Sequence, residues 1–161
     1  MQVKKRNGCI EEVSFDKVIH RIKAQCLVSP VCNSVDYILI AQKVCARIYD
    51  GVSTSELDEL AANTCISLST EEPEYGIIAT RIIISNNHKQ TPPTFREAMY
   101  NIYNQPNPVV SQQLYDISQQ FSSEIESRID YMRDYDIDFF GFKTLEKSYL
   151  KTTSTGANVV E

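Results

Sequence analysis

The chain has 161 residues, 42% of them hydrophobic, and a formal net charge of −5 at pH 7. This composition is typical of a packed globular protein, and it argues against a disordered chain or a general nucleic-acid-binding protein. No apolar run approaches 18 residues, and the basic N-terminus is not followed by the apolar core of a signal peptide. We therefore expect a globular domain with no nucleic-acid or membrane partner.

The cysteines and histidines show no pattern of a metal site. There are five cysteines and two histidines, and no two cysteines are spaced C-x-x-C. Single cysteines scattered over helical patterns are usually small apolar residues in a reducing compartment. We therefore expect a cytoplasmic protein without a bound metal, in which all five cysteines belong to the core: Cys9, Cys26, Cys32, Cys45 and Cys65.

The first 26 residues predict a β-hairpin followed by a helix. Short strands over 2–6 and 9–13 flank Asn7-Gly8, which is the preferred pair at the centre of a type I′ turn. Ser14 is placed to cap a helix over 15–27, whose apolar residues recur every three or four positions.

Three further helices are predicted over 35–49, 54–68 and 74–87. Gly51 is expected to end the first of these in the left-handed conformation, and Ser53-x-x-Glu56 is a capping box for the second. The third is apolar on more than one face, which predicts the most buried helix. The expected fold is mainly α, with a small N-terminal β-hairpin capping a four-helix bundle.

Consecutive prolines at 92–93 mark the clearest boundary in the chain, because they disfavour helix at the residues before them. Beyond them the pattern predicts short, polar helices separated by loops. The expected segments are helices over 95–103 with Thr94 as cap, 109–120, 123–131 and 144–150, an acidic aromatic loop over 134–138, and a polar, turn-like end over 152–161.

Positive charge gathers at the N-terminus of this acidic chain. Residues 1–25 contain six Lys or Arg and three acidic residues, a net charge of +3, so the remainder carries −8. A basic hairpin beside a helix N-terminus can bind phosphate, because charged side chains and free backbone N–H groups converge on one anion. The alternative is a solvated charged hairpin, which would be the better explanation of Lys-Lys-Arg on its own.

Longer motifs favour the first explanation. V-K-K-R-N-G-x-x-E-x-V-x-F-D-K over 3–17, GVSTSELD over 51–58 and ATRIIISNNHK over 79–89 resemble the ATP-cone. That module is the regulatory nucleotide-binding domain of the large subunit of ribonucleotide reductase. FGFKTLEKSYL over 140–150 resembles the entry into the catalytic domain of the class I enzyme of eukaryotic and viral type. The resemblance implies an ATP-cone over 1–91 and an incomplete helical start of the catalytic domain over 94–161.

The resemblance also implies roles for individual residues. Lys5, Arg6, Lys17 and Lys89 would hold the phosphates, and the segment from Glu11 to Lys17 would wrap the adenine. Glu11 can accept a hydrogen bond from the exocyclic amine, while Val13 and Phe15 can pack on the ring. The full set of expected nucleotide-binding residues is Lys5, Arg6, Glu11, Glu12, Val13, Ser14, Phe15, Asp16, Lys17, Thr54, Asp58 and Lys89.

Thr54 and Asp58 lie four residues apart, hence on one helical face. In the family these positions lie at the ribose and phosphate side, where a carboxylate can sense the 2′-hydroxyl that separates ATP from dATP. Each residue also has a structural explanation that stays open. The lysines can be solvated surface residues, Val13 and Phe15 ordinary core, and Thr54 and Asp58 stabilisers of a helix N-terminus.

The implied function is allosteric control of deoxyribonucleotide synthesis, with ATP activating and dATP inhibiting. Mg²⁺ would accompany the triphosphate, and the partners would be further large subunits and the small radical-generating subunit. No catalytic cysteine can be assigned, because all five cysteines precede Pro92. We therefore expect no ribonucleotide reduction from this polypeptide alone.

Two alternatives remain from the sequence. One is a helical interaction protein that binds no nucleotide and whose basic hairpin contacts an acidic partner. The other is a nucleotide-sensing transcriptional regulator, which would need a zinc ribbon with paired C-x-x-C before the cone. The chain contains no such pair.

Overall fold

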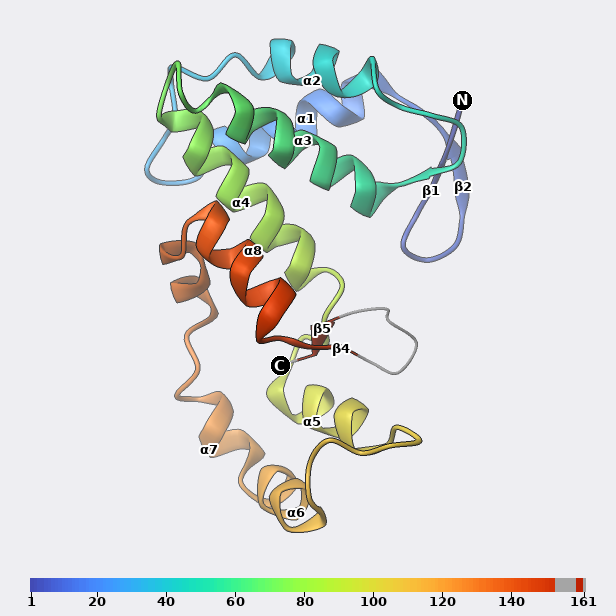
Figure 1. Ribbon diagram of the computed structural model, residues 1–161, viewed down its shortest axis with the longest axis vertical. Coiled ribbons are helices and arrows are strands. Elements are labelled where there is room, and N and C mark those ends of the chain that lie inside the picture. Colours follow the sequence, from blue (N-terminus) through green and yellow to red (C-terminus); the bar gives the residue numbers. More distant parts are fainter. Residues whose placement is uncertain (153–158, 161) are drawn as a thin grey trace. The chain divides into compact units, whose positions relative to one another are not determined.

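The computed structural model describes residues 1–152 and 159–160, so most of the predicted polar end lies outside the described residues. The chain forms two compact units, and Figure 1 labels the helices and strands of both. The first contains Met1–Asn86 together with Ile137–Phe139, and the second contains residues 87–136 together with the chain from Phe140 onward. None of the helices in the described part of the chain combines the length and the hydropathy of a membrane-spanning segment.

The first unit opens with a three-stranded sheet in the order β2-β1-β3. β1 (Gln2–Lys4) pairs antiparallel with β2 (Ile10–Glu12), which confirms the predicted hairpin. β3 (Val52–Ser53) pairs parallel with β1, with Val3 opposite Val52. This third strand was not predicted, because a two-residue strand carries no pattern of its own.

The hairpin loop differs from the prediction. The backbone N–H of Lys5 donates to Cys9 O at 2.8 Å and that of Gly8 donates to Lys5 O at 2.9 Å, so the loop has three residues, 6–8. The predicted two-residue type I′ turn centred on Asn7-Gly8 is wrong. Gly8 instead closes a three-residue loop at φ +84°, and the Asn7 side chain accepts from the Cys9 N–H at 3.1 Å. Arg6 consequently lies in the loop and not in a strand.

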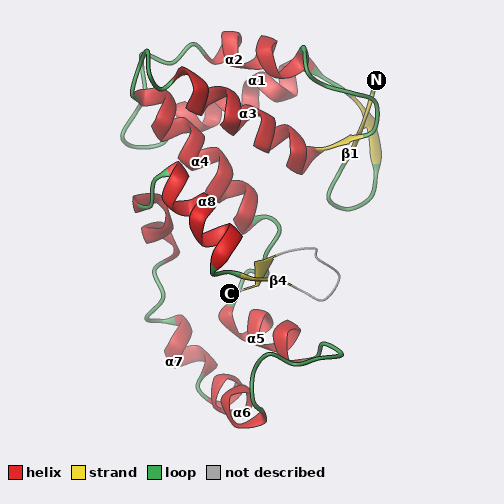
Figure 2. Ribbon diagram, in the orientation of Figure 1, coloured by secondary structure: helices red, strands yellow, loops and turns green. Residues whose placement is uncertain are grey.

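Four helices follow in the first unit: α1 (Phe15–Cys26), α2 (Tyr37–Cys45), α3 (Thr54–Leu68) and α4 (Glu74–His88) (Figure 2). Two predicted caps are confirmed. Ser14 Oγ accepts from the Lys17 N–H at 3.4 Å. Ser53 and Glu56 form the capping box, with bonds of 3.1 and 2.8 Å. Both helices therefore begin where their local sequence predicts.

The prediction of one helix over 35–49 is wrong at both ends. α2 begins after Asp36, whose carboxylate accepts from the N–H groups of Ile38 and Leu39, both at 3.0 Å. It ends at Cys45, well before Gly51. Gly51 does have a positive φ of +84°, but its N–H donates to Gln2 O at 2.9 Å. Pairing with β1 therefore takes this segment out of the helix.

The core of the first unit is built around α4, as predicted. Its isoleucines 78, 82, 83 and 84 are almost completely buried, together with Val44 of α2 and Cys65 of α3. Arg81 is also buried, and its guanidinium donates to the backbone oxygens of Gln25 and Pro30, each at 2.8 Å. Every polar group that α4 carries into the core must be satisfied in this way.

The prediction that all five cysteines lie in the core holds only in part. Cys26, Cys32 and Cys65 are buried, and burial raises the pKa of the Cys65 thiol to about 12. Cys45 is half-buried, and Cys9 is exposed. Cys9 follows the hairpin loop, where a residue has few neighbours to cover it, so it is not a core residue.

The second unit is helical, with α5 (Phe95–Tyr103), α6 (Gln112–Gln120), α7 (Ser122–Glu126), a 3₁₀ helix (Tyr131–Asp136) and most of α8 (Phe139–Ser148). β4 (Lys151–Thr152) pairs antiparallel with β5 (Val159–Val160). Thr94 caps α5 as predicted, accepting from the Glu97 N–H at 3.3 Å.

Other boundaries in this unit were wrong. α6 begins three residues after the predicted start, because Ser111 caps it by accepting from the Leu114 N–H at 3.2 Å. α7 stops at Glu126, and the predicted acidic loop is largely the 3₁₀ helix. α8 begins at Phe139, five residues before the predicted start. Short helices with few apolar residues give weak periodicity, so their ends depend on caps and packing.

Candidate functional site

Four cations gather around two carboxylates in the first unit. Lys5 and Arg6 come from the hairpin, and two more cations, Lys17 and Arg21, come from successive turns of α1. The carboxylates are Glu11 of β2 and Asp58 of α3. We call these six side chains the cation cluster: Lys5, Arg6, Lys17, Arg21, Glu11 and Asp58.

Glu11 holds the two lysines. Lys17 Nζ lies 2.8 Å from Glu11 Oε2, and Lys5 Nζ forms an ion pair with Glu11 Oε1. The hydrogen bond from Lys17 and then that from Lys5 lower the pKa of the Glu11 carboxyl from 4.5 to about 2. All three side chains reach solvent, so the pairs order the lysines more than they stabilise the fold.

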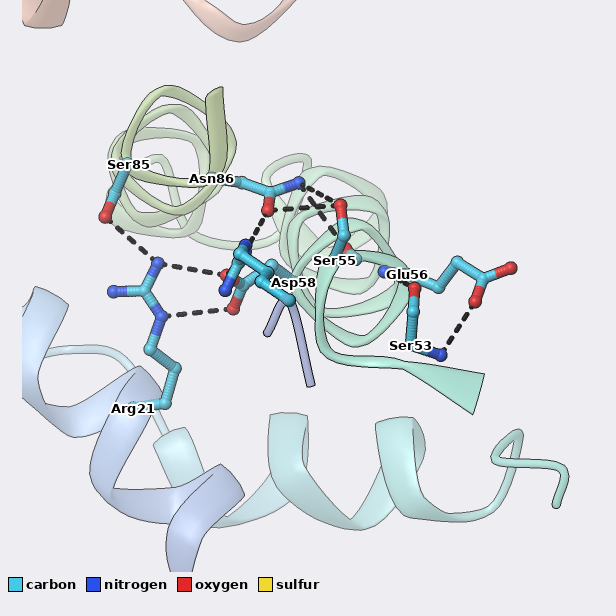
Figure 3. Close-up of polar contacts among 8 residues, drawn as sticks. Arg21, Ser53, Ser55, Glu56, Asp58, Ser85 and Asn86 are labelled. Carbon is cyan, nitrogen blue, oxygen red and sulfur yellow. Dashed lines mark hydrogen bonds and ion pairs between the residues drawn. The ribbon is translucent and has the colours of Figure 1, made fainter. Parts of the chain in front are cut away.

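Asp58 holds the two arginines and is far more enclosed, with only 7% of the residue exposed. Arg21 approaches it with two parallel bonds, Nε to Oδ1 at 3.0 Å and Nη2 to Oδ2 at 3.2 Å (Figure 3). Arg6 makes one bond, from Nη2 to Oδ2 at 3.2 Å. A single buried carboxylate thus bridges the hairpin loop and α1.

Polar side chains of α3 and α4 complete the surroundings of the arginines. Arg21 Nη2 also donates to Ser85 Oγ at 3.1 Å, and Arg6 donates to the Asn86 side-chain oxygen. Asn86 Nδ2 in turn donates to the Ser55 side-chain oxygen at 3.2 Å (Figure 3). The hairpin, α1, α3 and α4 therefore meet at one hydrogen-bonded network.

Five of the twelve predicted residues belong to the cation cluster: Lys5, Arg6, Glu11, Lys17 and Asp58. The other seven do not belong to it. Phe15 is 39% exposed, so the alternative that it is an ordinary core residue does not describe it. Thr54 is half-buried at the first position of α3, and Lys89 follows α4 within the second unit. The remaining four lie between β2 and the first turn of α1: Glu12 and Asp16 are exposed, and Val13 and Ser14 are half-buried.

Four residues of the network were absent from the predicted site: Arg21, Ser55, Ser85 and Asn86. Arg21 carried a recognisable pattern, because it lies four residues after Lys17 and hence on the same face of α1. The other three are small polar residues on α3 and α4 that lie inside the motifs over 51–58 and 79–89, but no local pattern assigned them to the site. Their place depends on how the four helices pack.

The arrangement is suited to binding a polyphosphate. The six charged side chains of the cation cluster carry a net charge of +2, and guanidinium and ammonium groups bind phosphate oxygens through charge-assisted hydrogen bonds. The N-terminus of α1 adds the positive end of its dipole beside Lys17. Across the described residues, no three His, Cys, Asp or Glu side chains are grouped so as to hold a metal ion.

Comparison with known proteins agrees with this geometry. The chain is 50% identical over 159 residues to "Ribonucleoside-diphosphate reductase large subunit" of Dictyostelium discoideum, covering 93% of this chain and 18% of that protein. It is 42% identical to the ribonucleoside-diphosphate reductase large chain of Schizosaccharomyces pombe and 44% identical to the ribonucleoside-diphosphate reductase large subunit of Monkeypox virus. Both of those matches run over 157 residues, 93% of this chain, and 19% and 20% of the relatives.

The chain thus spans about a fifth of the length of the curated relatives it matches. The ATP cone domain family matches residues 1–90, which contain the hairpin, all four helices of the first unit and the whole cation cluster. The chain therefore belongs to the ATP-cone family.

Proposed function

We propose that the cation cluster binds ATP or dATP, and that the chain is the allosteric regulatory portion of a ribonucleoside-diphosphate reductase large subunit. The observation that carries this proposal is the convergence of four cations, from the hairpin and α1, on two carboxylates. The family match over residues 1–90 and the names of the relatives support it.

The phosphates of the bound nucleotide would form ion pairs with cations that are now paired with Glu11 and Asp58. Lys5 and Arg6 come from the hairpin and Lys17 from the exposed first turn of α1, where a triphosphate can reach them. Lys89 stays a proposed phosphate contact. Glu11, once relieved of its lysines, would accept a hydrogen bond from the adenine amine. The exposed ring of Phe15 would offer an apolar surface to the base.

Asp58 and Thr54 would discriminate between ATP and dATP at the ribose. The Asp58 carboxylate would accept a hydrogen bond from the 2′-hydroxyl of ATP, a group that dATP lacks. In this proposal ATP favours activity and dATP favours inhibition, through a coupling free energy between this site and a distant active site.

Mg²⁺ would bind only together with the triphosphate. Glu11 and Asp58 are the carboxylates of the cation cluster, and both already bind cations of the protein. Phosphate oxygens and water would therefore supply most of the metal's ligands, as is usual for Mg²⁺.

The wider assignment is also proposed. Residues 1–91 would form the regulatory domain and residues 94–161 the helical start of the catalytic domain, whose barrel the larger relatives would contain. Further large subunits and a small radical-generating subunit would be the partners, and the cytoplasm would be the location. The five free cysteines support a reducing compartment.

The direct test is the melting temperature of the 161-residue chain with Mg²⁺ and ATP, dATP, GTP or no nucleotide. A ligand at a hundred times its dissociation constant stabilises the fold by about 2.7 kcal/mol, which raises the melting temperature by several degrees. We expect a rise with both adenine nucleotides, a much smaller rise with GTP, and loss of the rise in Lys17→Met.

The matched control is Lys23→Met, which removes a cation from the last turn of the same helix, outside the cluster. It should leave the nucleotide-dependent rise unchanged. A folded chain whose melting temperature does not respond to ATP or dATP would overturn the proposed function and favour a helical interaction protein.

A further inference from the structure

The two arginines on Asp58 are not equivalent. Arg21 binds the carboxylate through two parallel bonds, of 3.0 and 3.2 Å, that engage both oxygens. Arg6 binds through one bond of 3.2 Å to Oδ2, an oxygen that it shares with Arg21. Two-point guanidinium–carboxylate pairs fix geometry and are stronger than one-point pairs. Arg21 is therefore the firmer partner of Asp58.

The places of the two arginines in the fold increase this difference. Arg6 lies in the three-residue hairpin loop, and 30% of its side chain is exposed. Arg21 lies in the middle of α1, has 24% of its side chain exposed, and is tied to α4 through Ser85 Oγ at 3.1 Å. Arg6 is also bonded to α3 and α4, through Asp58 and Asn86, but by a single bond to each. Arg21 makes three bonds to the same two helices, and its backbone is helical, so it changes partners less readily than a loop residue does.

We propose that Arg21 is a positioning residue of the nucleotide site, which holds the Asp58 carboxylate in a fixed orientation while Arg6 exchanges between Asp58 and a bound phosphate. This inference rests on the proposed function. It adds a residue to the site and divides the cations by task. Lys5, Arg6 and Lys17 are released to the ligand, whereas Arg21 stays with the protein.

Asp58 needs a counter-charge that stays in place when Arg6 binds phosphate. If Asp58 had only Arg6 as partner, binding of phosphate by Arg6 would leave a carboxylate that is 7% exposed without a counter-charge. An uncompensated buried charge is strongly unfavourable. With Arg21 in place, Asp58 stays ionised and keeps one orientation, so its oxygens can recognise a ribose hydroxyl.

The experiment is a double-mutant cycle on the full 161-residue chain. Dissociation constants for ATP and for dATP, each with Mg²⁺, are measured by isothermal titration calorimetry. The chains are wild type, Arg21→Met, Asp58→Asn and the double variant. We expect Arg21→Met to move the ratio of the two dissociation constants toward one by roughly tenfold, the effect of losing one charge-assisted contact. In the Asp58→Asn background the same substitution should leave the ratio unchanged.

Two further variants sharpen the test. Arg21→Lys keeps the charge but cannot reproduce the two-point contact, so it should not restore the ratio. Lys23→Met, on the same helix and outside the cluster, should leave it as in wild type. Circular dichroism checks the fold of every variant, and if Arg21→Met fails to fold, Arg21→Lys and Arg21→Gln carry the cycle.

The outcomes separate the two proposals. A wild-type chain that binds neither nucleotide removes the proposed function, and this inference with it. A chain that binds nucleotide but shows equal dissociation constants for ATP and dATP overturns the inference and the proposed discrimination at the ribose, and leaves the proposed nucleotide binding in place. An Arg21→Met effect on the ratio that is zero, or that persists at the same size after Asp58→Asn, overturns the inference alone. A purely structural role for Arg21 would lower stability in both backgrounds without moving the ratio.

Discussion

Replacing Asp58 by Asn removes one negative charge from the centre of the network and leaves the shape of the side chain almost unchanged. Asp58 accepts three charge-assisted hydrogen bonds, two from Arg21 and one from Arg6. Asn retains one oxygen acceptor, and its amide group would face an arginine N–H. The substitution therefore weakens three bonds and leaves two guanidinium groups close together without a counter-charge.

The size of the effect follows from these contacts. A hydrogen bond to a charged group contributes about 1.5–3 kcal/mol and a neutral one about 1 kcal/mol, so three weakened bonds amount to roughly 1.5–6 kcal/mol. The arginine side chains are 24% and 30% exposed, and water screens their repulsion. We therefore expect Asp58→Asn to lower the free energy of unfolding by about 2 kcal/mol, near the low end of that range.

The assay is urea denaturation of the full chain, with Asp36→Asn as the matched control. Asp36 caps α2 by accepting from two backbone N–H groups, and asparagine caps helices as well as aspartate does. The same chemical change there should cost less than about 0.5 kcal/mol. Equal losses in the two variants, or a loss at Asp58 below about 0.5 kcal/mol, would show that the arginine pairs of Asp58 do not stabilise the fold.

Three other predictions follow from burial and charge. The Glu11 carboxyl should titrate with a pKa of about 2 in the folded chain and near 4.5 when unfolded. The pairing of Glu11 with its two lysines therefore stabilises the fold above about pH 4.5, and this stabilisation is lost as the pH falls toward 2. A folded-state pKa of 4.5, measured by carboxyl NMR, would contradict the pairing. Ile82→Ala should lower the free energy of unfolding by about 3–4 kcal/mol. Ile77→Ala, at a 41% exposed position of the same helix, should lower it by less than about 1 kcal/mol. Similar losses for the two variants in urea denaturation would contradict the packing of α4. Iodoacetamide should alkylate exposed Cys9 long before buried Cys65, whose thiol has a pKa raised to about 12, and mass spectrometry showing the reverse order would contradict the fold.

The features that sequence predicted well are those determined by neighbouring residues. The capping box of Ser53 and Glu56 and the cap at Ser14 act within one helical turn, so four residues of sequence contain the whole interaction. The burial of α4 follows in the same way from its unbroken apolar centre. These local rules located the hairpin and the helices of the first unit.

What sequence missed depends on residues far apart in the chain. β3 exists because Val52 pairs with Val3, and the same pairing draws the segment around Gly51 out of the predicted helix. The loop of the hairpin has three residues because the register places Lys5 opposite Cys9. Asn-Gly favours a turn at that place but does not determine the register.

In the candidate site, too, the sequence shows the local features and does not show the contacts between residues far apart in the chain. The lysines and arginines were visible as a cluster of charge near the N-terminus, and the family resemblance assigned most of them a role. The partners of those cations were not visible, since Arg21 meets Asp58 across 37 positions of sequence and Arg6 meets Asn86 across 80. Only the packed helices show that Arg21 belongs to the site and that Asp58 is shared.

The most direct test of the account is the affinity of the 161-residue chain for ATP with Mg²⁺, measured by isothermal titration calorimetry in wild type, Lys17→Met and Lys23→Met. If the cation cluster is a nucleotide site, wild type and Lys23→Met bind one ATP per chain with the same affinity, and Lys17→Met binds at least tenfold more weakly. If all three chains bind equally, or if wild type binds no ATP, the cluster is not the site and the proposed function is wrong.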